Sequence, residues 1–147
     1  MPRALITGMS GTGKSSLLAE LERRGRPVLD TDDEGWHLPD GTWDEPRLLR
    51  RLKAEPDLVV AGTAENQGRF SPWFSAVVLL SAPVEVLLER LRSRTNNPYG
   101  RTPEEQADVR RYVVEVEPLL RATATVEIDA RRPLAEIADA VEALLQA

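Results

Sequence analysis

One stretch near the start of the chain has the residue types and spacing of a phosphate-binding loop. Residues 8–15 read GMSGTGKS, which matches the pattern G-x-x-x-x-G-K-[ST] at every fixed position. Glycines allow positive φ angles, so that successive backbone N–H groups can surround an anionic phosphate. We therefore expect Lys14 to reach the β- and γ-phosphates of a nucleotide and the Ser15 hydroxyl to ligate Mg²⁺.

The predicted nucleotide contacts extend from this loop into the helix that follows it, because a helix start supplies further N–H groups and a positive dipole end. Ser16 is expected near the α-phosphate. The sequence has no N-K-x-D guanine signature, so the predicted ligands are ATP and Mg²⁺ rather than GTP. The loop residues expected to bind the nucleotide are Gly8, Met9, Ser10, Gly11, Thr12, Gly13, Lys14, Ser15 and Ser16.

Acidic residues follow the second predicted strand, as Asp30-Thr31-Asp32-Asp33-Glu34. Ligands of open α/β sheets bind beyond the carboxyl ends of the strands, so these acids should face the glycine loop. The strand Leu58–Ala61 has no metal-binding acid at its end, and we expect Asp30 to complete the Mg²⁺ site. Asp32 is then predicted to accept, or to orient, the proton of an acceptor hydroxyl. The alternative is a solvated acidic turn.

Two further segments could contact an acceptor molecule. Trp36 lies in a polar loop and could form a wall against a ring-shaped ligand, or could anchor the loop to the core. Asn66 and Arg69 follow the third predicted strand, in a polar segment bounded by glycines. They are candidate acceptor contacts, and an ordinary strand-to-helix connection is the alternative. His37, the only histidine, is more simply explained as structural.

An arginine-bearing lid is predicted at about residues 93–103. Arg90 and Arg94 are four residues apart on one predicted helix, and Arg101 lies between that helix and the next. Closure of such a loop would exclude water and bring positive charge to the phosphoryl oxygens. We assign this role to Arg101 and place Arg94 nearer the adenine or ribose. Surface arginines on solvated helices are the alternative reading.

Short apolar runs alternate with helical patterns along the whole chain, which indicates βαβ units and a parallel sheet. The fold class is therefore α/β. The predicted strands are Arg3–Thr7, Pro27–Leu29, Leu58–Ala61, Ala76–Leu80 and Thr125–Ile128. The predicted helices are Ser15 to about Arg24, Glu45–Ala54, Val84–Arg94, one from a Thr102 cap to about Arg121, and one from Pro133 that buries Leu134, Ile137, Val141 and Leu145.

Composition indicates one globular domain over residues 1–147, with an acceptor-side segment at about 30–56. Hydrophobic residues make up 41% and charged residues 29%, and no apolar run approaches the roughly 20 residues of a membrane span. The net charge of −5 argues against general nucleic-acid binding. The absence of cysteine excludes disulfides and thiol catalysis and fits a cytoplasmic protein. We expect a monomer or a weak homodimer.

These motifs together resemble the nucleoside-monophosphate-kinase-like branch of P-loop proteins, particularly shikimate and gluconate kinases. The resemblance implies a three-layer α/β/α P-loop NTPase fold with five parallel strands in the order 2-3-1-4-5. In shikimate kinases the first acid of a similar D-x-D helps to hold Mg²⁺ and the second meets the acceptor hydroxyl, which corresponds to Asp30 and Asp32. The adenine-side arginine of the family corresponds to Arg94.

The sequence therefore predicts a kinase that moves the γ-phosphoryl group of ATP to a small molecule. A regulatory P-loop ATPase without a small-molecule acceptor is the alternative. Shikimate kinases carry three glycines after the third strand, where this chain has Gly62-Thr63-Ala64. Residues 30–45 are acidic and contain no arginine or lysine. This local charge favours an uncharged or cationic hydroxyl compound as the acceptor.

Overall fold

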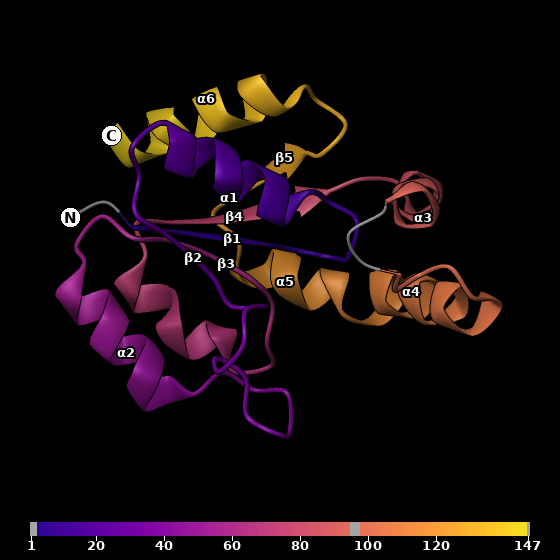
Figure 1. The fold of residues 1–147 in the computed structure, drawn as a ribbon, viewed down its shortest axis with the longest axis horizontal. Helices are drawn as coiled ribbons and strands as arrows, with labels where there is room; N and C mark the ends of the chain where they lie inside the picture. The colour runs from indigo at the N-terminus through magenta and orange to yellow at the C-terminus, as the bar shows by residue number, and fades with distance from the viewer. Residues whose placement is uncertain (1–2, 95–97, 147) are drawn as a thin grey trace.

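A parallel sheet of five short strands forms the centre of the protein (Figure 1). The computed structural model describes residues 3–94 and 98–146. The strand order is β2-β3-β1-β4-β5 and every pair is parallel, which confirms the predicted order 2-3-1-4-5. The strands are β1 (Ala4–Gly8), β2 (Val28–Asp30), β3 (Val59–Ala61), β4 (Ala76–Ser81) and β5 (Val126–Asp129).

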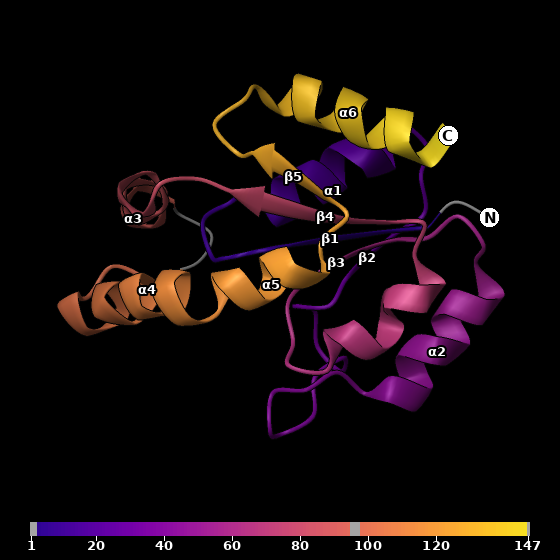
Figure 2. The same ribbon diagram turned by 180° about the vertical axis from the view of Figure 1, so that it is seen from behind.

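Helices cover both faces of the sheet, which confirms the predicted three layers. Figure 1 shows α1 and α6 on one face and α2 and α5 on the other, and Figure 2 shows the same layers from behind. The helices α3 and α4 lie beyond the carboxyl ends of the strands. The helices are α1 (Lys14–Arg23), α2 (Glu45–Ala54), the 3₁₀ helix η1 (Gln67–Trp73), α3 (Val84–Ser93), α4 (Pro103–Glu115), α5 (Glu117–Thr123) and α6 (Leu134–Gln146).

The strands are apolar on both sides because each face of the sheet packs against helices. Ile6 and Val78 belong to one core, together with apolar residues of α1 and α6. Their neighbours Leu5 and Val77 belong to a second core, with residues of α2 and η1. The alternation of side chains along a strand thus places neighbouring residues of each apolar run in different cores.

The predicted helix from Thr102 to about Arg121 is wrong in one respect, since the chain forms two helices there. Thr102 caps α4 as expected, with its hydroxyl accepting from Glu105 N at 3.1 Å and a Glu105 carboxylate oxygen accepting from Thr102 N at 3.3 Å. The break comes at Val116, immediately before α5. Pro118 is the cause, because proline has no N–H for the helical bond and its ring collides with the preceding turn.

Two smaller differences concern the third loop and the last helix. Part of the segment after β3, predicted as a polar loop, forms η1, whose Phe70 is buried in the second core. In α6, Ile137, Val141 and Leu145 are buried as predicted, whereas Leu134 is exposed. Leu134 is the first residue of the helix and is not part of the core that the later residues of α6 enter.

The carboxyl ends of the strands bring five connections to one end of the sheet. These connections are the glycine loop after β1, the acidic segment after β2, the segment after β3, the short link from β4 to α3 and the link from β5 to α6. Within the part of the chain that the structure describes, no helix has the length and apolarity needed to cross a bilayer.

Candidate functional site

The glycine loop turns between β1 and α1 in a conformation that only glycine adopts easily. Gly8 has φ 152°, and a Cβ atom there would lie 2.5 Å from the carbonyl oxygen of Leu80 on the neighbouring strand. Gly13 has φ 93° and stands at the N-cap of α1 without a side-chain cap. The first N–H groups of α1 therefore remain available to an anion at the positive end of the helix dipole.

Lys14 lies across this loop rather than extending into solvent. Its Nζ donates to the carbonyl oxygens of Gly8 at 2.7 Å and Met9 at 3.2 Å. Burial lowers the pKa of Lys14, while the charges of Asp32 and Asp30 oppose that shift. The ammonium group has three donors, so it can hold the loop and still address a phosphate oxygen.

Ser15 and Asp30 meet at the start of α1, as the predicted Mg²⁺ site requires. The Ser15 hydroxyl donates to Oδ2 of Asp30 at 2.8 Å, and Oδ1 of Asp30 accepts from Asp32 N at 3.0 Å. Among the described residues no three His, Asp or Glu side chains form a metal cluster. Mg²⁺ in nucleotide sites commonly takes one or two protein oxygens and completes its shell with phosphates and water. These two oxygen donors fit that pattern.

A cavity of about 540 Å³ opens in front of the loop. It brings together side chains from α1, from the segment after β2, from α3 and from the predicted lid. Lys14 and Ser15 from the glycine loop, Asp32 from the acidic segment and Arg94 from the predicted lid share this one cavity. Its lining residues are Ser10, Gly11, Gly13, Lys14, Ser15, Ser16, Asp32, Arg90, Arg94 and Tyr99.

Arg90 has a larger part in this site than its sequence suggested. Its guanidinium donates to the carbonyl oxygen of Gly11 at 3.2 Å and to that of Ala130, after β5, at 2.6 Å. Arg90 therefore joins the glycine loop to the connection that precedes α6. The four-residue spacing between Arg90 and Arg94 indicated that both lie on one face of a helix. The spacing alone could not identify the groups that Arg90 contacts. Tyr99, also in the cavity wall, had no signal of this kind.

The two predicted lid arginines occupy different positions. Arg94 ends α3 and lines the cavity, and it donates to the carbonyl oxygen of Tyr99 at 3.3 Å. Burial and the neighbouring charge of Arg101 lower the pKa of Arg94, whereas Asp32 opposes that shift. Arg101 is exposed, lies outside the cavity wall and donates to the carbonyl oxygen of Arg94. Residues 95–97 of the predicted lid lie outside the described residues.

The residues predicted to contact the acceptor interact with other parts of the protein in this structure. Trp36 is buried in the second core, with the guanidinium carbon of Arg47 4.1 Å from the centre of its ring. The amide of Asn66 pairs with the Trp43 backbone, accepting from N at 2.9 Å and donating to O at 3.0 Å. Arg69 is exposed and pairs with Glu45. Roles for Trp36, Asn66 and Arg69 in acceptor binding stay predictions.

The segment after β3 also supports the glycine loop through a residue that sequence reasoning missed. The Thr63 hydroxyl donates to the Gly8 carbonyl oxygen at 3.1 Å and lies 3.0 Å from the hydroxyl of Thr7. Thr63 stands beside Gly62, where a Cβ atom would lie 1.8 Å from the Thr31 hydroxyl. The loops after β1, β2 and β3 are thus packed directly against one another.

Comparison with known proteins agrees with this arrangement. Residues 5–111 match the model of a family described as AAA domain. A shikimate kinase of Nitrobacter winogradskyi is 29% identical over 137 residues, which cover 79% of this chain and 64% of the relative. A dephospho-CoA kinase of Deinococcus radiodurans is 33% identical over 95 residues, covering 63% of this chain and 44% of the relative. The chain thus spans less than two thirds of the length of these curated relatives.

Among solved structures, the shikimate kinase from Acinetobacter baumannii in complex with shikimate is similar over nearly the whole chain. The alignment covers 99% of this chain and 92% of that one, with 25% identity and a TM-score of 0.68. The strand order, the glycine loop and the family match over residues 5–111 all agree. The chain therefore belongs to the AAA domain family, as a P-loop protein of the nucleoside-monophosphate-kinase-like group.

Proposed function

We propose that the protein is an ATP-dependent phosphotransferase that moves the γ-phosphoryl group of ATP to a hydroxyl group, or to a phosphate, of a small acceptor. The observation that carries this proposal is the shared cavity. Lys14 and Ser15, which suit a nucleotide phosphate, line the same cavity as Asp32, a carboxylate that is not needed to bind a nucleotide. A phosphoryl donor site and an acid suited to an acceptor hydroxyl therefore adjoin.

ATP would bind with its phosphates against residues 8–16. Backbone N–H groups and the start of α1 supply fixed positive charge, and Lys14 adds a mobile one. Mg²⁺, held by Ser15 and Asp30, would neutralise charge on the β- and γ-phosphates. Arg90 keeps the loop in place from the side of α3, because it bonds to the carbonyl oxygen of Gly11.

Transfer breaks the bond between the γ-phosphorus and its bridging oxygen to the β-phosphate, and forms a bond from the γ-phosphorus to the acceptor oxygen. Asp32 would accept or orient the proton that the acceptor hydroxyl loses. Arg94, in the cavity wall, would meet the nucleotide on the adenine or ribose side. Arg101 would stabilise the charge that develops on the transferred group, which requires it to leave its contact with the carbonyl oxygen of Arg94.

The acceptor we propose is uncharged or cationic. Asp32 lines the cavity, and the two acids that follow it in the sequence, Asp33 and Glu34, are exposed. Arg47 and Arg69, which lie outside the cavity wall, are occupied, since Arg47 lies over the Trp36 ring and donates to a carbonyl oxygen, and Arg69 pairs with Glu45. An acceptor with a carboxylate or phosphate would meet acidic side chains here. A polyol or an amino alcohol would meet hydrogen-bond acceptors of suitable charge.

The named relatives support a kinase without identifying the acceptor. One relative is a shikimate kinase and the other is a dephospho-CoA kinase, so both are kinases and they differ in the molecule that they phosphorylate. A fold of this kind hosts several acceptors, so the acceptor must be inferred from the site itself. A cytoplasmic location, a monomeric or weakly dimeric state and the absence of general nucleic-acid binding stay predictions.

An assay of ADP release with ATP and Mg²⁺ across a panel of acceptors tests the proposal. The panel holds polyols, sugars, amino sugars, hydroxy acids, nucleosides and nucleotides. We expect little ADP without an acceptor and a strong increase with one uncharged or cationic class, together with a phosphorylated product. A low rate that no acceptor changes would instead favour a regulatory ATPase. A strong increase in ADP release with a hydroxy acid would support a kinase but would contradict the proposal that the acceptor is uncharged or cationic.

A further inference from the structure

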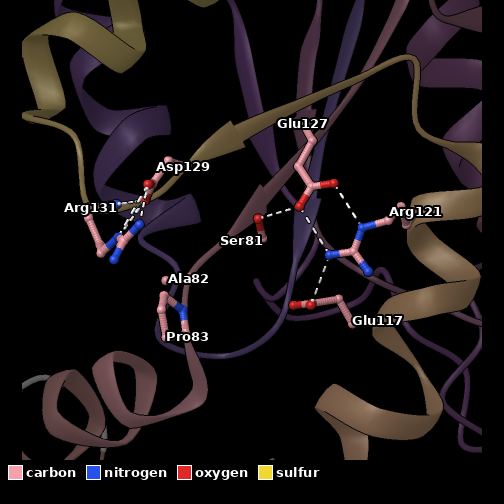
Figure 3. A pocket seen from close by; sticks show the side chains of 8 residues that line it. All are labelled: Ser81, Ala82, Pro83, Glu117, Arg121, Glu127, Asp129 and Arg131. Carbon is pink, nitrogen blue, oxygen red and sulfur yellow. Dashed lines mark hydrogen bonds and ion pairs between the residues drawn. The ribbon is translucent and has the colours of Figure 1, made fainter.

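A second cavity, of about 390 Å³, lies at the edge of the sheet (Figure 3). It is bounded by the ends of β4 and β5, the start of α3 and the side of α5. Its wall and the wall of the nucleotide cavity share no residue. The residues around it are Ser81, Ala82, Pro83, Glu117, Arg121, Glu127, Asp129 and Arg131.

The two cavities lie at opposite ends of α3. The helix starts next to Pro83, in the wall of the second cavity, whereas Arg90 in its last turn and Arg94 directly after it line the nucleotide cavity. A ligand in the second cavity would therefore lie outside the cavity that holds Lys14, Ser15 and Asp32.

Glu117 in this wall has one carboxylate oxygen without a partner. Its side chain is only 9% exposed. Oε1 accepts from the Arg121 guanidinium at 3.1 Å, whereas Oε2 is buried and has no hydrogen-bond partner among the described residues. In Figure 3 the Glu117 carboxylate points from α5 toward Ala82 and Pro83. A buried carboxylate oxygen left unpaired is costly, so a donor at this position would be strongly favoured.

The positive charges of the wall are already matched by acids. Arg121 binds both oxygens of Glu127, at 2.8 and 3.0 Å, and Glu127 also accepts from the Ser81 hydroxyl. Arg131 binds both oxygens of Asp129. These contacts hold the pKa of Glu127 and that of Asp129 at about 2, so both are ionised at neutral pH.

Three carboxylates and two guanidinium groups surround this cavity, so that the acidic groups outnumber the basic ones by one. The carboxylate oxygen without a partner is Oε2 of Glu117. We propose that the cavity binds a small organic cation with a primary ammonium group, which donates to Oε2 of Glu117 while its short carbon chain rests against Ala82 and Pro83. Oε2 is covered in this structure, so binding needs a partial turn of the carboxylate about a torsion with broad preferences, which brings Oε2 toward the cavity and tilts Oε1 relative to Arg121.

The competing ligand class is an anion. The start of α3 carries the positive end of a helix dipole, and Arg131 stands in the wall. An anion would, however, be repelled by the unpaired oxygen of Glu117. It would also have to compete with the carboxylates of Glu127 and Asp129 for the two arginines. A site for cations and a site for anions would therefore rank small probes of similar length and different charge in opposite orders of affinity.

The test on the wild-type protein is a nuclear magnetic resonance titration with propylammonium, 1-propanol and propionate. We expect saturable shifts of the backbone amides of Ser81, Glu117 and Arg121 with propylammonium. Propanol and propionate should bind at least about tenfold more weakly, because a charge-assisted hydrogen bond is lost. Equal binding of propanol, tighter binding of propionate, or no saturable shift with propylammonium would each overturn the proposal.

The variant Glu117→Gln keeps the size of the side chain and removes its charge. It should weaken propylammonium binding at least about tenfold, whereas Glu115→Gln, an exposed acid two residues earlier and outside the cavity wall, should leave it unchanged. Unaltered affinity in Glu117→Gln would reject the assigned contact. If that variant does not fold, the wild-type series of three probes decides alone. ATP binding measured in parallel separates this site from the proposed kinase site, because failure of one leaves the other intact.

Discussion

The two sides of the proposed active site are built in different ways. On the nucleotide side the ligand would meet backbone N–H groups of a glycine loop and the start of α1, with Lys14 lying on the loop. On the acceptor side it would meet side chains, and most of the candidates there already have partners within the protein. The residues of the short glycine motif would thus bind the nucleotide mainly through their backbone conformation. The positions of the acceptor-side residues depend instead on contacts with distant parts of the chain.

The two sides therefore differ in how far their construction depends on the acceptor. A phosphate cradle needs a fixed loop and one lysine, and any acceptor leaves that requirement unchanged. The acceptor side must change with each substrate. The segment after β2 packs against the rest of the fold through Trp36 and Trp43, and Asn66 forms hydrogen bonds with the Trp43 backbone. Asp32 is the acid of this segment that lines the shared cavity.

The largest effect is expected from Lys14→Ala. Loss of the ammonium group removes a charge that would be directed at the phosphates, so turnover should fall by about 10³-fold. Lys53→Ala is the matched control, because Lys53 is the only other lysine and lies on α2, near the Trp73 ring. Steady-state ADP release measures both variants. Turnover in Lys14→Ala within tenfold of wild type would mean that the nucleotide side does not depend on this contact.

Asp32→Asn separates the two sides most directly. The amide keeps the shape of the side chain but is a poor proton acceptor, so turnover should fall by about 10²-fold. ATP affinity, measured by isothermal titration calorimetry, should stay within about threefold of wild type. Asp33→Asn is the neighbouring control, since Asp33 does not line the cavity. Wild-type turnover in Asp32→Asn would assign the proton transfer elsewhere.

Most of the fold could be predicted from the sequence because local patterns and the global topology agree. Continuously apolar strands, amphipathic helices and the glycine motif each point to the same parallel sheet, and the family resemblance supplied the strand order. The break at Val116 was missed because apolar periodicity continues through it, although Pro118 marked it in the sequence.

Apart from Arg94, which helix spacing and the family resemblance indicated, the candidate site could be predicted only where its residues are adjacent in the sequence or follow a strand directly. Residues 8–16, Asp30 and Asp32 satisfy that condition. Arg90 does not, because its partners on Gly11 and Ala130 are 79 and 40 residues away. The pairing of Asn66 with Trp43 spans 23 residues, and no periodicity reports such a contact. Side chains with distant partners therefore need the structure.

Asn66→Ala tests whether the acceptor side is held by this pairing. The change leaves the backbone N and O of Trp43 without their partners, so the free energy of unfolding should fall by about 1–3 kcal/mol. Chemical denaturation measures the loss, and Gln146→Ala, an exposed amide at the end of α6, should change stability little. Unchanged stability with a raised KM for the acceptor would identify Asn66 as a substrate contact instead.

Arg69→Ala should have the smallest effect on stability and gives the sharpest test of the acceptor prediction. The side chain is 75% exposed and its nitrogen lies 3.4 Å from a Glu45 oxygen, and such surface pairs contribute about 0–1 kcal/mol. Arg92→Ala, which removes another exposed ion pair on α3, provides the control. If Arg69 binds the acceptor, KM for the acceptor should rise about tenfold while the affinity for ATP stays constant. An unchanged KM would assign Arg69 to the surface and leave Asp32 as the acceptor-side residue that acts in the reaction, because a side chain this exposed can be lost without disturbing the fold that positions Asp32.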